Sequence, residues 1–249
     1  MPPSPFGPRF LAVASGKGGV GKTWFSITLA HALARRGRRV LLFDADFGLA
    51  NVDIQLGLVP RRDLGHVLSG ETDFAGAVEP FAPGGFDVLA GPSGSGALAS
   101  MGAGVLDRVL GLLGAQAAGY DHVLLDLAAG LEGGVRVTAA WADALIVLAT
   151  DEPTSITDAY ATLKLHAADR PEGDVRLVVN QAATPAGAER TAGVIGRACT
   201  TFLGRAPVFL GGIRRDARVP LTIRHQALLL TRHPATLAAV DVEAIASRL

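Results

Sequence analysis

The chain has 249 residues, of which 49% are hydrophobic and 18% charged, and its formal net charge is zero. This length allows one large α/β domain or two small ones, and the neutral balance gives the whole chain no general attraction for nucleic acids or membranes. A single cysteine, Cys199, excludes a disulfide within the chain and the paired cysteines of an iron–sulfur carrier, and it fits a reducing cytosol. No apolar run reaches the length of about 18 residues that a membrane-spanning helix needs.

Short apolar segments alternate with helical patterns along the chain. The expected strands are residues 9–15, 39–44, 85–90, 121–126, 143–149, 174–180 and 206–210. The expected helices are residues 21–36, 101–117, 134–141, 154–169, 185–202, 217–226 and 235–248. Strands that are apolar on both faces are typical of a parallel sheet covered by helices. We therefore expect a short tail over residues 1–8 and one α/β domain over 9–249, built on a single doubly wound, mostly parallel sheet flanked by helices.

The first expected strand leads into a glycine-rich loop and then a helix. Residues 16–23 match the phosphate-binding pattern G-x-x-x-x-G-K-[ST] in the strand–loop–helix context that this pattern requires. Lys22 can reach the β- and γ-phosphates of a nucleotide, and the Thr23 hydroxyl can hold Mg²⁺. The alternative is a glycine-rich turn that binds nothing. The residues assigned to nucleotide binding are Gly18, Gly19, Val20, Gly21, Lys22, Thr23 and Trp24.

Two aspartates stand at the end of the expected strand 39–44. Asp44 and Asp46 are separated by one small residue, so they are spaced to face the same way. Carboxylates beside a phosphate loop can hold Mg²⁺ or orient a water molecule, and we expect Asp44 to support the metal site. The alternative is that both aspartates cap a helix that begins near Gly48.

Two further expected strands end in polar residues. Strand 121–126 closes on Asp126, a Walker B arrangement in which the carboxylate binds Mg²⁺ directly or through water. Strand 174–180 closes on Asn180, whose amide can both donate to and accept from the edge of adenine. The guanine-reading sequence Asn/Thr-Lys-x-Asp is absent, which favours ATP over GTP. A helix cap or turn is the alternative role for Asn180.

These motifs resemble the deviant Walker A ATPases, the MinD/ParA group, whose pattern K-G-G-x-G-K-[ST] is matched at every fixed position by residues 17–23. Lys17 has no clear task within one subunit, and the resemblance implies that it crosses a dimer interface to the phosphates of the partner's nucleotide. It also implies that Asp46 positions the attacking water. Gly130 is then the glycine that lets the backbone approach the γ-phosphate.

The resemblance further implies that residues 211–216 touch the base, which assigns Arg214 and Asp216 to the nucleotide site. Many members of the group have proline where this chain has Arg214, so the detail of the base pocket departs from the family pattern.

Within the group, residues 46–70, 91–94 and 152–160 are similar to the FlhG regulators of flagellar number and placement. This likeness implies an ATPase that uses Mg²⁺, dimerises with ATP and recruits a protein partner in flagellar assembly. FlhG proteins often carry an N-terminal Asp-Gln-Ala segment that stimulates a GTPase, and residues 1–8 do not contain it. The alternatives are MinD-like division-site placement, ParA-like cargo or chromosome partitioning, and a nucleotide-binding adaptor that does not hydrolyse.

The C-terminal third is rich in arginine. The cluster is Arg205, Arg214, Arg215, Arg218, Arg224 and Arg232. ParA relatives bind DNA without sequence preference through basic residues near this end, but we favour a solvated or partner-facing surface. The last expected helix has one arginine and no lysine, so we expect it to pack on the domain rather than lie on a membrane. We expect a cytoplasmic protein, for which recruitment to the membrane or a cell pole requires a partner or the face between Arg214 and Arg232.

Overall fold

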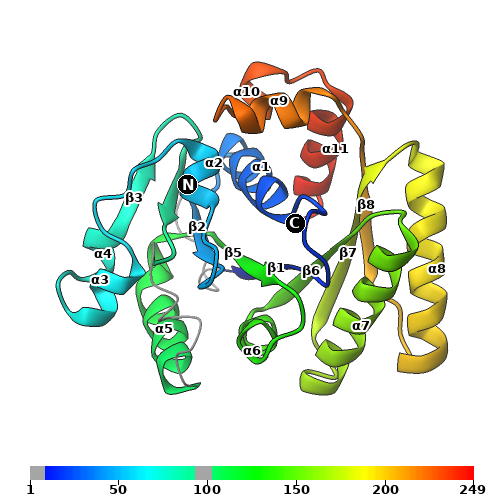
Figure 1. Cartoon of the computed structure of the whole chain (residues 1–249), viewed down its shortest axis with the longest axis horizontal. Coiled ribbons are helices and arrows are strands. Elements are labelled where there is room, and N and C mark those ends of the chain that lie inside the picture. The colour runs from blue at the N-terminus through cyan, green and yellow to red at the C-terminus, as the bar shows by residue number, and fades with distance from the viewer. Residues whose placement is uncertain (1–8, 93–102) are drawn as a thin grey trace.

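The computed structural model describes residues 9–92 and 103–249, and these form one sheet with helices on both sides (Figure 1). The strand order is β3-β4-β2-β5-β1-β6-β7-β8, and every neighbouring pair is parallel except β3 with β4. The strands are β1 Arg9–Ser15, β2 Val40–Ala45, β3 Val78–Phe81, β4 Phe86–Leu89, β5 His122–Ala129, β6 Ala144–Ala149, β7 Asp174–Ala182 and β8 Val208–Arg214.

Two layers of helices cover this sheet. The helices are α1 Lys22–Arg35, α2 Val52–Leu56, α3 Leu64–Ser69, α4 Phe74–Ala77, α5 Ala103–Gln116, α6 Gly133–Trp141, α7 Pro153–Asp169, α8 Pro185–Leu203, α9 Arg218–Arg224, α10 Leu229–Arg232 and α11 Leu237–Ala246, with a 3₁₀ turn at Ala117–Gly119. Helices α1, α2, α9, α10 and α11 lie over one face, and α5, α6, α7 and α8 lie over the other (Figure 1). Both faces of the sheet are therefore buried, which explains why its central strands are almost continuously apolar.

Strand β1 shows how the two cores divide the side chains. Leu11 and Val13 belong to the core under α1, while Ala12 and Ala14 belong to the core on the opposite face. β1 lies between β5 and β6, where the order of the strands reverses. Ligands of open parallel sheets bind outside the carboxyl ends of the strands at such a point. The glycine-rich loop that follows β1 is therefore placed where a ligand is expected.

The expected fold class is confirmed, and the main departure lies at β8. This strand was expected over residues 206–210 but runs from Val208 to Arg214, through two glycines that interrupt the apolar pattern. A Cβ on Gly212 would lie 2.2 Å from the Cβ of Ala188, so glycine allows α8 to pack closely on the sheet. The stretch 211–216, expected to touch the base, is thus partly strand.

The smallest elements were not expected at all. β3 has four residues and contains Pro80, which an edge strand tolerates because it has neighbours on one side only. Helices α2, α3 and α4 have six residues or fewer, too short to display a helical period. The tail expected over residues 1–8 lies outside the described residues.

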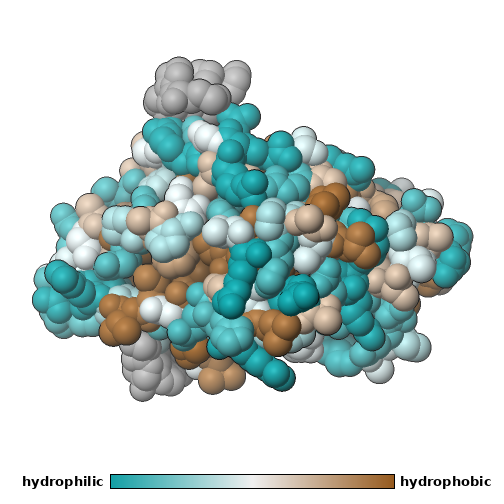
Figure 2. All heavy atoms as spheres, turned by 90° about the horizontal axis from the view of Figure 1, so that it is seen from above, coloured by the Kyte–Doolittle hydropathy of each residue, from teal (hydrophilic) through white to brown (hydrophobic). Residues whose placement is uncertain are grey.

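The C-terminal helix α11 packs against α1 and β8, with Val242 and Ile245 buried, as expected. Leu237 and Val240 are instead 50% and 49% exposed, so packing explains only part of its apolar character. On the neighbouring α9 and α10, Arg218, Arg224 and Arg232 are exposed. Seen from this side, the surface is hydrophilic across its middle and its hydrophobic residues form separate patches (Figure 2). None of the helices within residues 9–92 and 103–249 is long and apolar enough to cross a membrane.

Candidate nucleotide-binding site

The glycine-rich loop turns the chain from β1 into α1. Gly19 and Gly21 have φ angles of 79° and 89°, which side-chain-bearing residues rarely adopt. The first hydrogen bond of α1 runs from the Phe25 N–H to the Gly21 carbonyl, 3.0 Å away, so the N–H groups of residues 22–24 have no partner within the helix. These donors and the positive end of the helix dipole make an anion site. The side chain of Trp24 is buried in the core, which leaves its N–H as the group that can face a phosphate.

Three side chains of α1 converge on Asp126, which was expected to close its strand but lies within β5, which continues to Ala129. Lys22 Nζ lies 3.0 Å from Asp126 Oδ1, and Thr23 Oγ1 donates to Asp126 Oδ2 over 2.7 Å. Ser26 Oγ donates to Asp126 Oδ1 over 2.8 Å. All four residues are buried. The structure thus brings together the lysine and hydroxyl of the phosphate loop and the Walker B carboxylate, as the motifs predict.

The donor set around Thr23 and Asp126 fits Mg²⁺. This ion keeps several water molecules and is usually held by one or two carboxylates together with phosphate oxygens of the substrate. A hydroxyl and a carboxylate that already lie 2.7 Å apart match that requirement. Within the described ranges, no group of three His, Cys, Asp or Glu residues could form an all-protein metal cage. The site therefore suits an ion that arrives with a nucleotide.

Asp44 lies beside Asp126 but is already engaged by the backbone that follows it. The two aspartates are register partners on β2 and β5. Asp44 Oδ1 accepts the N–H of Asp46, and Oδ2 accepts the N–H groups of Asn51 and Val52, at 3.1, 2.8 and 2.9 Å. Burial, and then the nearby Asp126 carboxylate, raise the pKa of Asp44 to about 7. Asp44 thus holds the turn before α2, and its support of the metal stays a prediction.

Asp46 stands just beyond the end of β2. Its Oδ1 accepts the N–H groups of Gly48 and Leu49, at 3.2 and 2.9 Å, so the carboxylate closes its own turn. No helix begins near Gly48, because α2 starts at Val52. A cavity of about 450 Å³ opens between this turn, the end of β5 and helices α5 and α6, and Asp46 lines it. The structure gives Asp46 room to act on a water, and that role stays a prediction.

Lys17 has partners within its own chain, which corrects the view that it has no task in one subunit. Its Nζ lies 2.8 Å from Glu152 Oε2 and donates to Thr154 Oγ1 over 3.1 Å. Lys17 thus docks at the start of α7, and its hydrogen bond holds the pKa of Glu152 below the ordinary value. The side chains of Lys17 and Glu152 are 40% and 63% exposed, so the ion pair between them is weak. Gly130, with a φ of 109°, lies nearby, because its N–H donates to the Ser15 carbonyl over 3.0 Å.

Asn180 supports the phosphate loop. Its Nδ2 donates to the Val20 carbonyl over 2.8 Å, and its Oδ1 accepts the N–H of Gln181 over 2.9 Å. A Cβ on Gly21 would lie 2.6 Å from Asn180 Nδ2, so this contact also requires glycine. Gln181 has an unusual positive φ of 58°, and its amide reaches the carbonyl of Gly19. The Asn180 amide is therefore paired within the chain, and contact with adenine stays a prediction.

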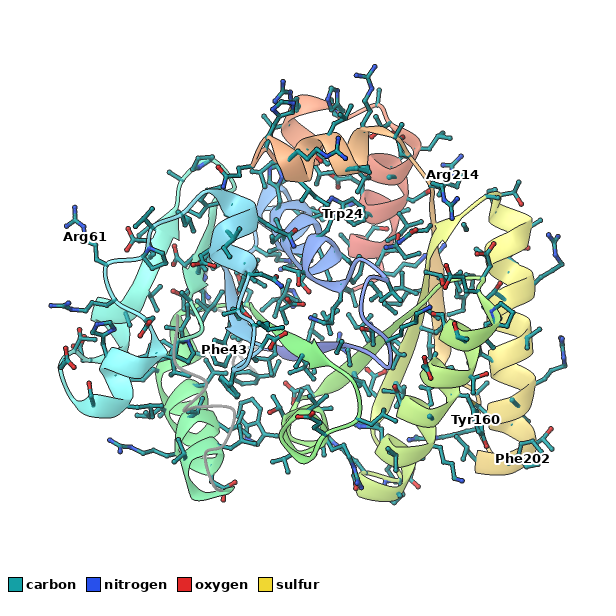
Figure 3. All side chains as sticks on the ribbon, viewed as in Figure 1. Trp24, Phe43, Arg61, Tyr160, Phe202 and Arg214 are labelled. Atoms are coloured by element: carbon teal, nitrogen blue, oxygen red, sulfur yellow. The ribbon has the colours of Figure 1, made fainter. Side chains whose placement is uncertain are left out.

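Arg214 and Asp216, assigned to the base pocket, are paired with residues of the C-terminal part. Arg214 lies at the end of β8 (Figure 3). Its Nε and Nη2 donate to the Asp241 carboxylate of α11 over 2.8 and 2.7 Å. Asp216 Oδ1 accepts the N–H of Arg218 over 2.9 Å. These contacts fix the end of β8, and base contact by either side chain stays a prediction.

Ser26, Glu152 and Thr154 belong to the site, although the sequence motifs did not identify them. Ser26 had a signal, since it lies one helical turn after Thr23 on the same side of α1. Glu152 and Thr154 lie in the stretch 152–160 that resembles the FlhG regulators, but nothing in the sequence indicated their contact with Lys17, because that contact depends on the placement of α7 beside the loop.

Comparison with known proteins agrees with this geometry. The model of the CobQ/CobB/MinD/ParA nucleotide binding domain matches residues 11–229. The antiactivator FleN of Pseudomonas aeruginosa is 34% identical, over 97% of this chain and 86% of that protein. The flagellum site-determining protein YlxH of Helicobacter pylori is 29% identical, over 97% of this chain and 81% of that protein. The septum site-determining protein MinD of Pyrococcus horikoshii, complexed with Mg-ADP, has the same fold, with a TM-score of 0.79 and 22% identity over 97% of this chain and 95% of that one. The expected resemblance to the MinD/ParA group and its FlhG-type members is confirmed.

Proposed function

The chain belongs to the family of CobQ/CobB/MinD/ParA nucleotide-binding domains, and we propose that it is an ATP-hydrolysing switch that regulates the number or placement of flagella. The observation that carries the proposal is the convergence of Lys22, Thr23 and Asp126 beside a loop that also bears Lys17. FleN and YlxH align with almost the whole chain, which favours a flagellar role over division-site placement or partitioning.

In this proposal each residue of the site has a defined part. The loop N–H groups and Lys22 bind the phosphates, while Thr23 and Asp126 hold Mg²⁺. The bound ion offsets the negative charge of the β- and γ-phosphates. Asp46 orients the attacking water, and Lys17 leaves Glu152 to reach the nucleotide of a second subunit. ATP thereby favours a dimer, and a protein partner in flagellar assembly recognises it. The protein acts in the cytoplasm and reaches the membrane or a pole through that partner.

Nucleotide binding is tested with Lys22→Ala. The change removes the cation that offsets phosphate charge, so calorimetry should show Mg-ATP affinity reduced about 10- to 100-fold. Lys164→Ala is the matched control, because Lys164 is exposed on α7, and it should bind as the wild type does. Unchanged affinity in Lys22→Ala would show that the loop is wrongly assigned. Phosphate release by the wild type distinguishes the switch from an adaptor that does not hydrolyse.

The cellular role is tested by deleting the gene in its own bacterium and counting flagella by electron microscopy. The proposal expects an altered number or position of flagella, restored by the wild-type gene and not by Lys22→Ala. Normal flagella together with misplaced division septa would instead favour the MinD-like role.

A further inference from the structure

Ser26 makes a contact with Asp126 that the phosphate-loop pattern does not require. Ser26 is fully buried, and its Oγ lies 2.8 Å from Asp126 Oδ1 and 3.1 Å from the carbonyl oxygen of Lys22. A hydroxyl has one proton to donate, and an ionised carboxylate is the stronger acceptor. The shorter distance also favours the carboxylate. Ser26 therefore donates to Asp126.

Thr28 shows the ordinary behaviour of a buried hydroxyl on the same helix. Its Oγ1 donates to the carbonyl of Trp24, four residues back, over 2.7 Å. Such bonds satisfy a hydroxyl locally without placing it on any other element. Ser26 differs because its hydroxyl joins α1 to Asp126 in β5, 100 residues further along the chain.

The three donors to Asp126 differ in their other tasks. In the proposed function, on which this inference rests, Lys22 binds phosphates and Thr23 binds Mg²⁺. Ser26 is 0% exposed while Lys22 and Thr23 are each 8% exposed, so it lies deeper than either. Its hydroxyl is therefore reserved for the carboxylate.

We propose that Ser26 is a positioning residue that fixes the orientation of Asp126 toward Mg²⁺. When Lys22 and Thr23 turn to the nucleotide, the carboxylate loses two of its three side-chain donors. The bond from Ser26 to Oδ1 then keeps the carboxylate from rotating. This role predicts an effect on Mg²⁺ binding rather than on nucleotide binding in general.

The test is Ser26→Ala, with ATP binding followed by calorimetry over a range of Mg²⁺ concentrations and again in EDTA. Hydrogen bonds to charged groups are among the strongest in proteins, so the Mg²⁺ concentration at half-saturation should rise roughly tenfold. Affinity for ATP in EDTA should stay that of the wild type. Thr28→Val removes a buried hydroxyl from the same helix without touching Asp126, and should match the wild type in both titrations.

Ser26→Cys is the second variant, because the thiol is a weak donor of similar size, and its Mg²⁺ dependence should fall between those of Ser26→Ala and the wild type. This variant carries the test if Ser26→Ala does not fold. Wild-type Mg²⁺ dependence in the folded variants would overturn the inference, and so would an equal loss of ATP affinity with and without Mg²⁺. If the wild type itself failed to bind Mg-ATP, the proposed function would fall instead.

Discussion

The carboxylate of Asp46 closes its own turn, and in the proposed function it also orients the attacking water. The side chain accepts the N–H groups of Gly48 and Leu49, so Asp46→Ala changes the turn as well as the chemistry. Asp46→Asn keeps an acceptor oxygen for the turn and loses only the negative charge. Positioning and electrostatics supply nearly all catalysis in phosphoryl transfer, so both variants should lose ATP turnover by a factor on the order of 10² or more.

Turnover is measured by phosphate release, and the dimeric state by light scattering. Both variants should still bind ATP and should accumulate as the ATP dimer. Normal turnover in Asp46→Asn, with loss only in Asp46→Ala, would show that the residue serves the turn and that another group orients the water.

Asp44 gives the stability of the protein a pH dependence. Its pKa is raised from 3.8 to about 7, so at intermediate pH the folded chain retains a proton that the unfolded chain has released. Stability should therefore fall as pH rises from about 4 to 7, by about 4 kcal/mol at most. Below about pH 4, Asp44 is protonated in both the folded and the unfolded chain, so its burial costs no free energy of ionisation. Above about pH 7 it is ionised in both, and the folded chain carries the full cost of a buried charge.

The check is urea unfolding of the wild type and Asp44→Asn at pH 5 and pH 8. An amide cannot ionise, so the variant should lose less stability between the two values than the wild type does. Asp151→Asn, at an exposed position, should keep the wild-type difference. Equal differences in all three proteins would argue against a raised pKa at Asp44.

The contacts of a single residue could be predicted from the sequence where a motif also defines the strand, loop or helix around that residue. Lys22, Thr23 and Asp126 were assigned from patterns that imply a strand, a loop and a helix, and the structure brings them together. The contact of the Asn180 amide with the phosphate loop was not expected, because it depends on the end of β7 lying beside Val20, and contact with adenine stays a prediction. Glu152 is 135 residues from Lys17, so only the fold could reveal their contact.

At the scale of elements, the predictions succeeded where a segment is long or its strand is apolar on both faces. Helices α7 and α8 were expected within one residue of their observed ends. β8 was misplaced because its close contact with α8 requires glycine, and glycine hides the apolar pattern of a strand. The position of β8 thus depends on tertiary packing, which a short stretch of sequence does not reveal.

The start of α7 holds Lys17 within its own chain. Because Lys17 docks on Glu152 and Thr154, a move toward a second subunit must break that contact. Glu152→Gln removes the ion pair, so the ATP dimer should form more readily. Each exposed ion pair contributes at most about 1 kcal/mol, and forming a dimer breaks one in each subunit, so the dimer dissociation constant should fall by about 30-fold or less.

The measurement is analytical ultracentrifugation with ATP in an Asp46→Ala background, which prevents turnover. Glu172→Gln, at an exposed position before β7, should leave the constant unchanged. Lys17→Ala should bind ATP and remain monomeric. A weaker dimer in Glu152→Gln would mean that Glu152 supports the interface instead of restraining Lys17.

At the scale of the whole molecule, the sheet places every assigned residue at the carboxyl ends of its strands or on the elements that follow them. The loop follows β1, Asp44 and Asp126 lie in β2 and β5, and Asp46 follows β2. Lys17 docks where α7 follows β6, and Asn180 lies near the end of β7. The alternation of strands and helices was enough to predict this common edge. The segment between β2 and β4, which contains α2, α3, α4 and β3, was not predicted, because its elements have only four to six residues.

The C-terminal helix should not bind lipid by itself. Residues 235–249 carry Arg248 as their only basic residue and Asp241 and Glu243 as acids, so anionic headgroups would repel them. Asp241 is also engaged with Arg214, and Val242 is buried against the domain. Of the apolar side chains, Leu237 and Val240 are about half exposed, too little surface for a membrane helix.

Sedimentation with anionic liposomes, with and without ATP, checks this expectation. Removing α11 would expose the core that it covers, so the informative variant is Leu237→Ser with Val240→Ser, which leaves the buried side of the helix intact. The wild type and the double variant should both remain in the supernatant, because neither joins an apolar face to a basic one. ATP-dependent pelleting of the wild type that the double variant loses would show that α11 is a membrane-binding helix after all.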